Sequence, residues 1–113
     1  MGWNPSPPVL GFPVLPTETV IVDLEVGNSD AIAVQLEHAN SGQNLTARVK
    51  VALNANATPA QTSFPDFQDP IPPKASGGSR VALIQTRGLH RIQIVGELSG
   101  IGGNVDAYIV RTP

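Results

Sequence analysis

The side chains that could carry chemistry in this chain are few and widely spaced. His38 and His90 have no ligand-like neighbours at the spacing of a metal site. Asp66 and Asp69 could help to hold a cation, but the sequence Asp-Phe-Gln-Asp lacks the ligand density of a calcium loop. Serine, histidine and aspartate all occur, but without a G-x-S-x-G nucleophile turn. We therefore expect no catalysis, no metal and no cofactor, and we expect both histidines to be core or surface residues.

Binding chemistry is concentrated in the aromatic residues, and most of these lie outside the segments with a strand pattern. Trp3 and Phe12 belong to a proline-rich N-terminal segment, and Phe64 and Phe67 belong to a proline-rich central segment. Aromatic side chains supply large apolar contact areas and concentrate at interface hot spots. The two segments therefore predict docking onto another protein. The residues expected to bind that partner are Trp3, Leu10, Phe12, Leu15, Phe64, Phe67 and Ile71.

Composition limits the class of partner. The 113 residues suit one domain, and the hydrophobic fraction of 41% is enough to fill its core. Charged residues make up only 14%, against about 25% in a typical soluble domain, which suits a surface covered by neighbours. The basic residues are scattered singly, so we expect no nucleic-acid partner. The chain has no cysteine, and its N-terminus has neither a signal-peptide pattern nor an apolar run long enough to span a membrane.

Apolar and polar residues alternate with the period of a β-strand in several segments. In residues 18–26, for example, Val20, Val22 and Leu24 share one side, whereas Asp23 and Glu25 share the other. No stretch free of glycine and proline shows the apolar spacing of a helix, so the prediction is an all-β fold. The predicted strands are 18–26, 31–38, 45–53, 80–86, 89–97 and 104–111.

Short turns rich in glycine and asparagine join the predicted strands. They predict two three-stranded meanders, 18–53 and 80–111. Each meander has one apolar face, and the two faces can pack about 10 Å apart in an antiparallel β-sandwich of six to seven strands. A small closed barrel is the alternative, and the order of the strands remains open.

Two proline-rich segments flank these meanders. Residues 1–17 are predicted to form an extended N-terminal arm, and the domain proper covers residues 18–113 with a long loop at 54–79. We expect the arm to dock on a neighbouring chain, a common device in symmetric assemblies. Its alternative is a strand that covers the edge of its own sheet. The loop is equally compatible with docking and with folding back to plug the open end of the sandwich.

The chain resembles the small β-sandwich decoration (cement) proteins on the heads of tailed bacteriophages. The likeness lies in the arm NPSPPVLGFPVLPTET, the aliphatic strands LTARVKVAL and RIQIVGEL, and the loop FPDFQDPIPP. It implies a homo-oligomer, with a trimer favoured, that sits on a major capsid protein where subunits meet and stiffens the shell. The protein would then lie on the head surface of a virion, and a non-viral chain would be cytoplasmic.

We therefore expect a non-enzymatic structural interaction protein, a virion decoration protein in the first instance. The alternative is a ligand- or carbohydrate-binding β-sandwich module such as a tail or fibre domain. Such modules usually present aromatic platforms on a strand face, and here only Tyr108 falls in a predicted strand.

Overall fold

The computed structural model describes residues 3–61, 67 and 69–112, and strands dominate these residues. The six strands predicted from the alternation are confirmed to within two residues at each end. The elements of the described residues are β1 (Asn4–Pro5), β2 (Val9–Val14), β3 (Thr19–Glu25), β4 (Ala31–His38), β5 (Leu45–Ala52), β6 (Ala60–Gln61), a 3-10 turn η1 (Lys74–Ser76), β7 (Ser79–Gln85), β8 (Arg91–Leu98) and β9 (Gly103–Arg111).

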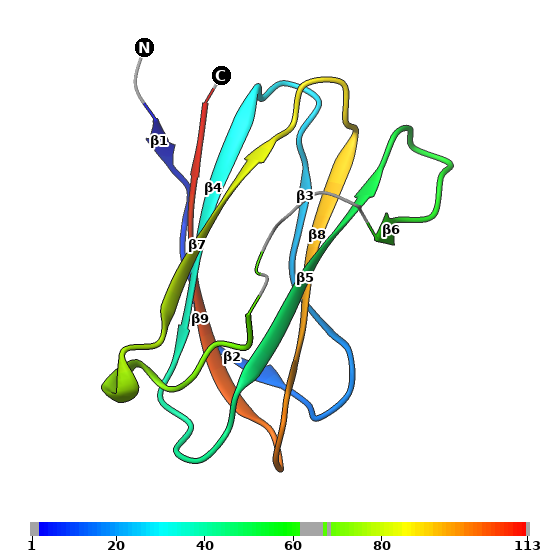
Figure 1. Ribbon diagram of the computed structural model, residues 1–113. Helices are drawn as coiled ribbons and strands as arrows, with labels where there is room; N and C mark the ends of the chain where they lie inside the picture. The colour runs from blue at the N-terminus through cyan, green and yellow to red at the C-terminus, as the bar shows by residue number, and fades with distance from the viewer. Residues whose placement is uncertain (1–2, 62–66, 68, 113) are drawn as a thin grey trace.

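The strands form two antiparallel sheets that pack face to face as a sandwich (Figure 1). Sheet A contains β1 and β2, which both pair with β9, followed by β4 and β7. Sheet B has the order β3-β8-β5-β6. Within the described residues no strand pairs with members of both sheets, so the sandwich describes the fold and the closed barrel does not.

The predicted meanders are wrong. Strands that follow one another in sequence alternate between the layers: β3 lies in sheet B, β4 in sheet A and β5 in sheet B again. A turn such as residues 27–30 reverses the chain, but its residues do not decide whether the next strand pairs alongside or crosses about 10 Å to the other layer. The turns were therefore recognised correctly and the partners of the strands were not.

The chain contains two copies of one three-strand unit, and each copy alternates between the two sheets. β3, β4 and β5 begin at Thr19, Ala31 and Leu45, and β7 and β8 begin the same 60 residues later, at Ser79 and Arg91. The middle strand of each copy is inserted between the outer strands of the other copy, so β8 lies between β3 and β5, and β4 lies between β7 and β9.

The pairing register obeys the same offset. Ile32 pairs with Arg111 in sheet A, and Ile92 pairs with Val51 in sheet B. Every further pair of β4 with β9 has its counterpart between β8 and β5. The two copies are therefore related by an approximate two-fold axis that runs between the sheets.

The arm and the loop are equivalent elements of these two copies. Phe12 of the arm pairs with Val105, and Ile71 of the loop forms a bridge to Leu45, which is the residue equivalent to Val105. Likewise β1 pairs with the end of β9, and β6 pairs with the matching end of β5. The prediction of a separate arm that reaches a neighbour is corrected here, because the arm covers the edge of its own sheet.

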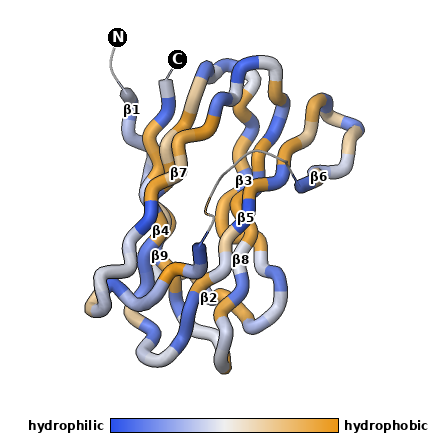
Figure 2. Tube along the Cα trace, viewed as in Figure 1, coloured by the Kyte–Doolittle hydropathy of each residue, from blue (hydrophilic) through white to orange (hydrophobic). Residues whose placement is uncertain are grey.

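The core between the sheets is almost wholly aliphatic. In Figure 2 hydrophobic residues recur along the strands of both layers. The inward positions of β4 and β8 are essentially inaccessible to solvent, and Phe67 is the one aromatic side chain among the described core residues. Alternating inward and outward positions of a strand leave the outer faces of both sheets free for other functions.

Candidate functional site

Three of the predicted docking residues belong to the core of the chain itself. Phe67 and Ile71 are 5% and 0% exposed, and Phe12 is half-buried against the core cluster. The expectation that Phe67 and Ile71 dock on a partner is therefore corrected in favour of the plug alternative. Phe64 lies outside the described residues. The predicted docking residues that remain exposed are Trp3, Leu10 and Leu15.

Backbone bonding explains why Ile71 is held inside. Its N–H donates to the carbonyl of Leu45 at 2.7 Å, and its own carbonyl accepts from the Leu45 N–H at 2.8 Å. A buried segment needs such partners, because an unpaired backbone group in the core costs about as much as a lost hydrogen bond. These two hydrogen bonds hold the loop at the edge of sheet B, where its apolar side chains complete the core.

His38 belongs to the same structural arrangement. Its side chain is buried, Nδ1 accepts from the backbone N–H of Asn40 at 3.1 Å, and Nε2 lies 2.8 Å from the carbonyl oxygen of Ile71. A neutral imidazole protonated on Nε2 satisfies both contacts. Of the two positions that the sequence left open, His38 occupies the core, and its contact with Ile71 holds the loop.

The outer face of sheet A carries several exposed apolar side chains. Leu83, Ala33 and Val110 stand side by side in one row across β7, β4 and β9. Val81, Gln35 and Tyr108 form the next row. Val81 and Leu83 are 62% and 63% exposed, which leaves two branched aliphatic side chains in water on adjacent positions of one face.

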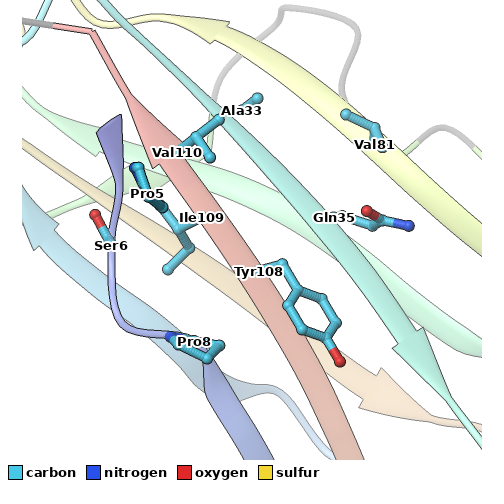
Figure 3. Close-up of a pocket in the computed structure, with 9 residues that line it drawn as sticks. All are labelled: Pro5, Ser6, Pro8, Ala33, Gln35, Val81, Tyr108, Ile109 and Val110. Atoms are coloured by element: carbon cyan, nitrogen blue, oxygen red, sulfur yellow. The ribbon is translucent and has the colours of Figure 1, made fainter. Parts of the chain in front are cut away.

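A shallow hollow lies on this face. It measures about 470 Å³, and no charged side chain lines it. Figure 3 shows Tyr108, Gln35 and Val81 on neighbouring strands, with Pro5 and Pro8 of the N-terminal segment along one side. The Gln35 amide donates to the hydroxyl of Ser79 at 2.7 Å, so its orientation is fixed. We call the surface formed by Ala33, Gln35, Val81, Leu83, Tyr108 and Val110 the apolar face.

The outer face of sheet B has the opposite character. Here the row equivalent to Leu83, Ala33 and Val110 consists of Asp23, Gln93 and Lys50. The Gln93 amide donates to Asp23 at 3.3 Å. Asp23 also forms an ion pair with Arg91 at 2.8 Å, and Lys50 forms one with Glu18 at 3.0 Å.

In this row, equivalent positions of the two copies thus carry apolar residues in sheet A and polar residues in sheet B. In the next row Tyr108 keeps the contrast, because its counterpart 60 residues earlier is Arg48. Gln35 does not keep it, because its counterpart in sheet B is the buried Val95. At the row of Leu83 and Asp23 the backbone pairing is the same in both sheets, so the fold itself does not require apolar residues there. The aromatic residues do not indicate this contrast; it is seen when the strands are compared at the offset of 60 residues that the structure shows.

Other chemistry is sparse in the part of the chain that the structure describes. No group of three or more histidine and acidic side chains gathers there in a way that could hold a metal ion. Arg87 and Asp30 form an exposed ion pair at 3.1 Å, and the hydrogen bond and charge of Asp30 raise the pKa of Arg87. No helix within residues 3–61, 67 and 69–112 has the length and apolarity to cross a membrane.

Comparison with known proteins leaves the apolar face as the main guide to function. No protein-family model matches this chain, and no curated protein sequence matches it either.

Proposed function

We propose that this chain is a non-enzymatic structural interaction protein that docks onto a larger assembly through the apolar face of sheet A. The observation that carries the proposal is the contrast between the row Leu83, Ala33, Val110 and its polar counterpart Asp23, Gln93, Lys50. Apolar positions that the same fold fills with polar residues elsewhere mark an interaction site.

The partner that we propose is the shell of a virion, which the chain decorates at the junctions of the major capsid protein. A flat, preformed sheet face loses little conformational freedom on docking, because its side chains stand on paired strands. Each aliphatic side chain that becomes fully buried offers about 1.5 to 3 kcal/mol before the cost of association. Repetition over a symmetric shell then turns modest contacts into stable occupancy. The trimer implied by the resemblance remains a prediction.

The test exchanges the apolar face for its own polar counterpart. The triple variant Ala33→Gln, Tyr108→Arg and Val110→Lys places on β4 and β9 the residues that occupy the equivalent positions of β8 and β5. We expect the stability to change by less than about 1 kcal/mol, since all three positions face outward. Binding to shells assembled from the major capsid protein of the same genome should weaken by roughly 100-fold, as measured by cosedimentation.

The control is Leu53→Lys, which changes an exposed leucine that follows β5 and is not part of the apolar face. This variant should bind shells like the wild type. Failure of the wild-type chain to cosediment with the shells, or equal binding by the triple variant, would reject the proposal.

The hollow favours a second candidate, a carbohydrate-binding module. The Tyr108 ring offers an apolar platform, and the Gln35 amide beside it can bond a hydroxyl group of an uncharged sugar. One exposed ring is a small platform, so this candidate ranks second. A glycan array separates the two: a glycan that binds the wild type and is lost in Tyr108→Ala supports the module, and docking onto shells without glycan binding supports decoration.

A further inference from the structure

The edge of β7 is a second surface of sheet A, separate from the apolar face. β7 is the terminal strand of sheet A, and among the described residues no strand pairs with its outer edge. It pairs with β4 over seven residues without a register shift and contains no proline. Regular edge strands of this length are templates for pairing with another chain, and proteins usually protect them.

The direction of the unpaired backbone groups follows from the neighbouring bonds. Backbone groups of an antiparallel strand alternate between its two neighbours. The N–H of Thr86, just beyond β7, donates at 2.9 Å to the carbonyl of Asp30, which precedes β4. The backbone N–H and C=O groups of residues 80, 82 and 84 therefore point toward β4 as well. The N–H and C=O groups of Val81, Leu83 and Gln85 point away from the sheet, and no strand of the described residues pairs with them.

The equivalent edge in sheet B is protected. β3 carries a bulge between Val20 and Val22, which disturbs pairing along an edge. Its outward positions hold Asp23 and Glu25, and the equivalent positions of β7 hold Leu83 and Gln85. The equivalent strands β3 and β7 thus differ: β3 is protected against edge pairing by a bulge and acidic residues, and β7 has neither.

We propose that β7 pairs with β7 of a second copy of this chain, antiparallel and about a two-fold axis at Ala82. A second copy fits this edge because the pattern of polar and apolar residues in β7 is symmetric about Ala82. Its outward positions read polar, apolar, apolar, polar as Ser79, Val81, Leu83 and Gln85. With an axis at Ala82, Ser79 of one copy lies opposite Gln85 of the other, and Val81 lies opposite Leu83 of the other. Polar residues therefore pair with polar residues and apolar residues with apolar residues.

Charge and geometry agree with this register. The one charged residue of β7, Arg80, falls opposite Ile84 of the other copy, so no like charges meet directly. Val81 and Leu83 exchange backbone bonds across the axis, because these are the residues whose groups point outward. Sheet A of one copy then continues into sheet A of the next, and the two apolar faces join into one surface. Self-pairing closes at two copies, so this proposal predicts a dimer where the resemblance predicts a trimer.

Light scattering across a concentration series tests the dimer. A single pair of seven-residue strands is a small interface, so the mass should rise from one chain toward two as the concentration increases. Leu83→Lys should raise the dissociation constant by roughly tenfold or more, because it places a charge in the apolar centre of the pairing. Leu53→Lys, at a similarly exposed leucine, should leave it unchanged.

A cysteine placed at the axis tests the register itself. The chain contains no cysteine, so a single introduced thiol can bridge only to a second copy. Residues that face each other without exchanging backbone bonds have Cα atoms about 4.5 Å apart, within the range of a disulfide. Ala82→Cys should therefore oxidise to a linked pair. Ala107→Cys, a small buried residue inside β9, should remain a thiol.

Three results overturn the proposal: a mass of one chain at all concentrations, a mass of three chains, or a self-association that Leu83→Lys leaves intact. An Ala82→Cys variant that fails to cross-link while the wild type dimerises rejects the register. Docking on shells is judged separately, because its triple variant changes β4 and β9 and leaves β7 untouched.

Discussion

The outer faces of sheets A and B stand on equivalent backbones, but they meet their surroundings differently. Sheet B presents Asp23, Gln93 and Lys50 with ion pairs to Arg91 and Glu18, and its edge strand is bulged. Sheet A presents Leu83, Ala33 and Val110 in the equivalent row, and its edge strand is regular. The polar row of sheet B thus serves as a reference for the residues that this fold carries on an outer face in contact with water. Departures from that reference are the features that we assign to interaction.

The largest expected effect is a loss of stability when the loop or the arm is truncated where it contacts the core. Ile71 and Phe12 occupy equivalent places beside Leu45 and Val105, but only Ile71 is fully buried. We expect Ile71→Ala to lower the free energy of unfolding by about 2 to 5 kcal/mol, since it opens a cavity in the core. Phe12→Ala should cost less because its side chain is half-exposed. Chemical denaturation of the two variants measures both values.

Equal losses from these two variants would mean that the arm plugs sheet A as firmly as the loop plugs sheet B. A loss below about 1 kcal/mol for Ile71→Ala would contradict the assignment of the loop to the core. The control is Leu10→Ala, which truncates an exposed residue of the arm and should leave stability nearly unchanged.

The strand pattern could be predicted from the sequence because most strands have one buried and one more exposed face; β8 is an exception, since its outward Val95 is also buried. Residues 31–38 alternate as Ile32, Val34 and Leu36 against Ala33, Gln35 and Glu37, and the structure buries the first set. Which strands pair could not be predicted from the turns, because a short turn permits both adjacent pairing and a crossing between sheets. The pairing is evident in the structure, where the strands of the two copies follow one offset of 60 residues.

The candidate site was harder to predict than the strands. Aromatic residues in proline-rich segments suggested docking, but proline-rich strands also suit sheet edges, and Phe67 and Ile71 were needed by an otherwise aliphatic core. Small aliphatic residues carry most of the apolar face, and they resemble ordinary strand residues in the sequence. Only the comparison of Leu83 with Asp23, and of Val110 with Lys50, shows that these positions are unusual.

An intermediate effect is expected at a matched pair of turns. Gly42 and Gly102 are equivalent, and both have positive φ angles, of 74° and 93°. Alanine strains both positions, at a cost of about 1 kcal/mol each. A Cβ at Gly102 would also lie 2.7 Å from the carbonyl oxygen of Val14, and a Cβ at Gly42 has open space.

We therefore expect Gly102→Ala to lower the melting temperature by more than Gly42→Ala. The additional loss reports how tightly the arm packs against the turn before β9. Equal melting temperatures in the two variants would show that the arm can move away from this turn at little cost.

The smallest effect is expected where sheet B is made to resemble sheet A. Asp23→Leu removes the ion pair with Arg91 and the hydrogen bond from Gln93. Both partners of the ion pair are about 40% exposed, and such pairs contribute about 0 to 1 kcal/mol. The free energy of unfolding should therefore fall by less than about 1 kcal/mol. The difference from the wild type should shrink further at high salt, which screens the pair.

Urea denaturation at low and high salt provides the measurement, with Asp23→Asn as the variant that removes the charge and keeps the shape. A loss above about 2 kcal/mol in Asp23→Leu would mean that the polar row holds sheet B together. The contrast between the two faces would then reflect unequal structural needs of the sheets. A small loss of stability would mean that the polar row of sheet B serves to keep that face hydrated. Sheet A would then lack a polar row because its outer face is covered by a partner.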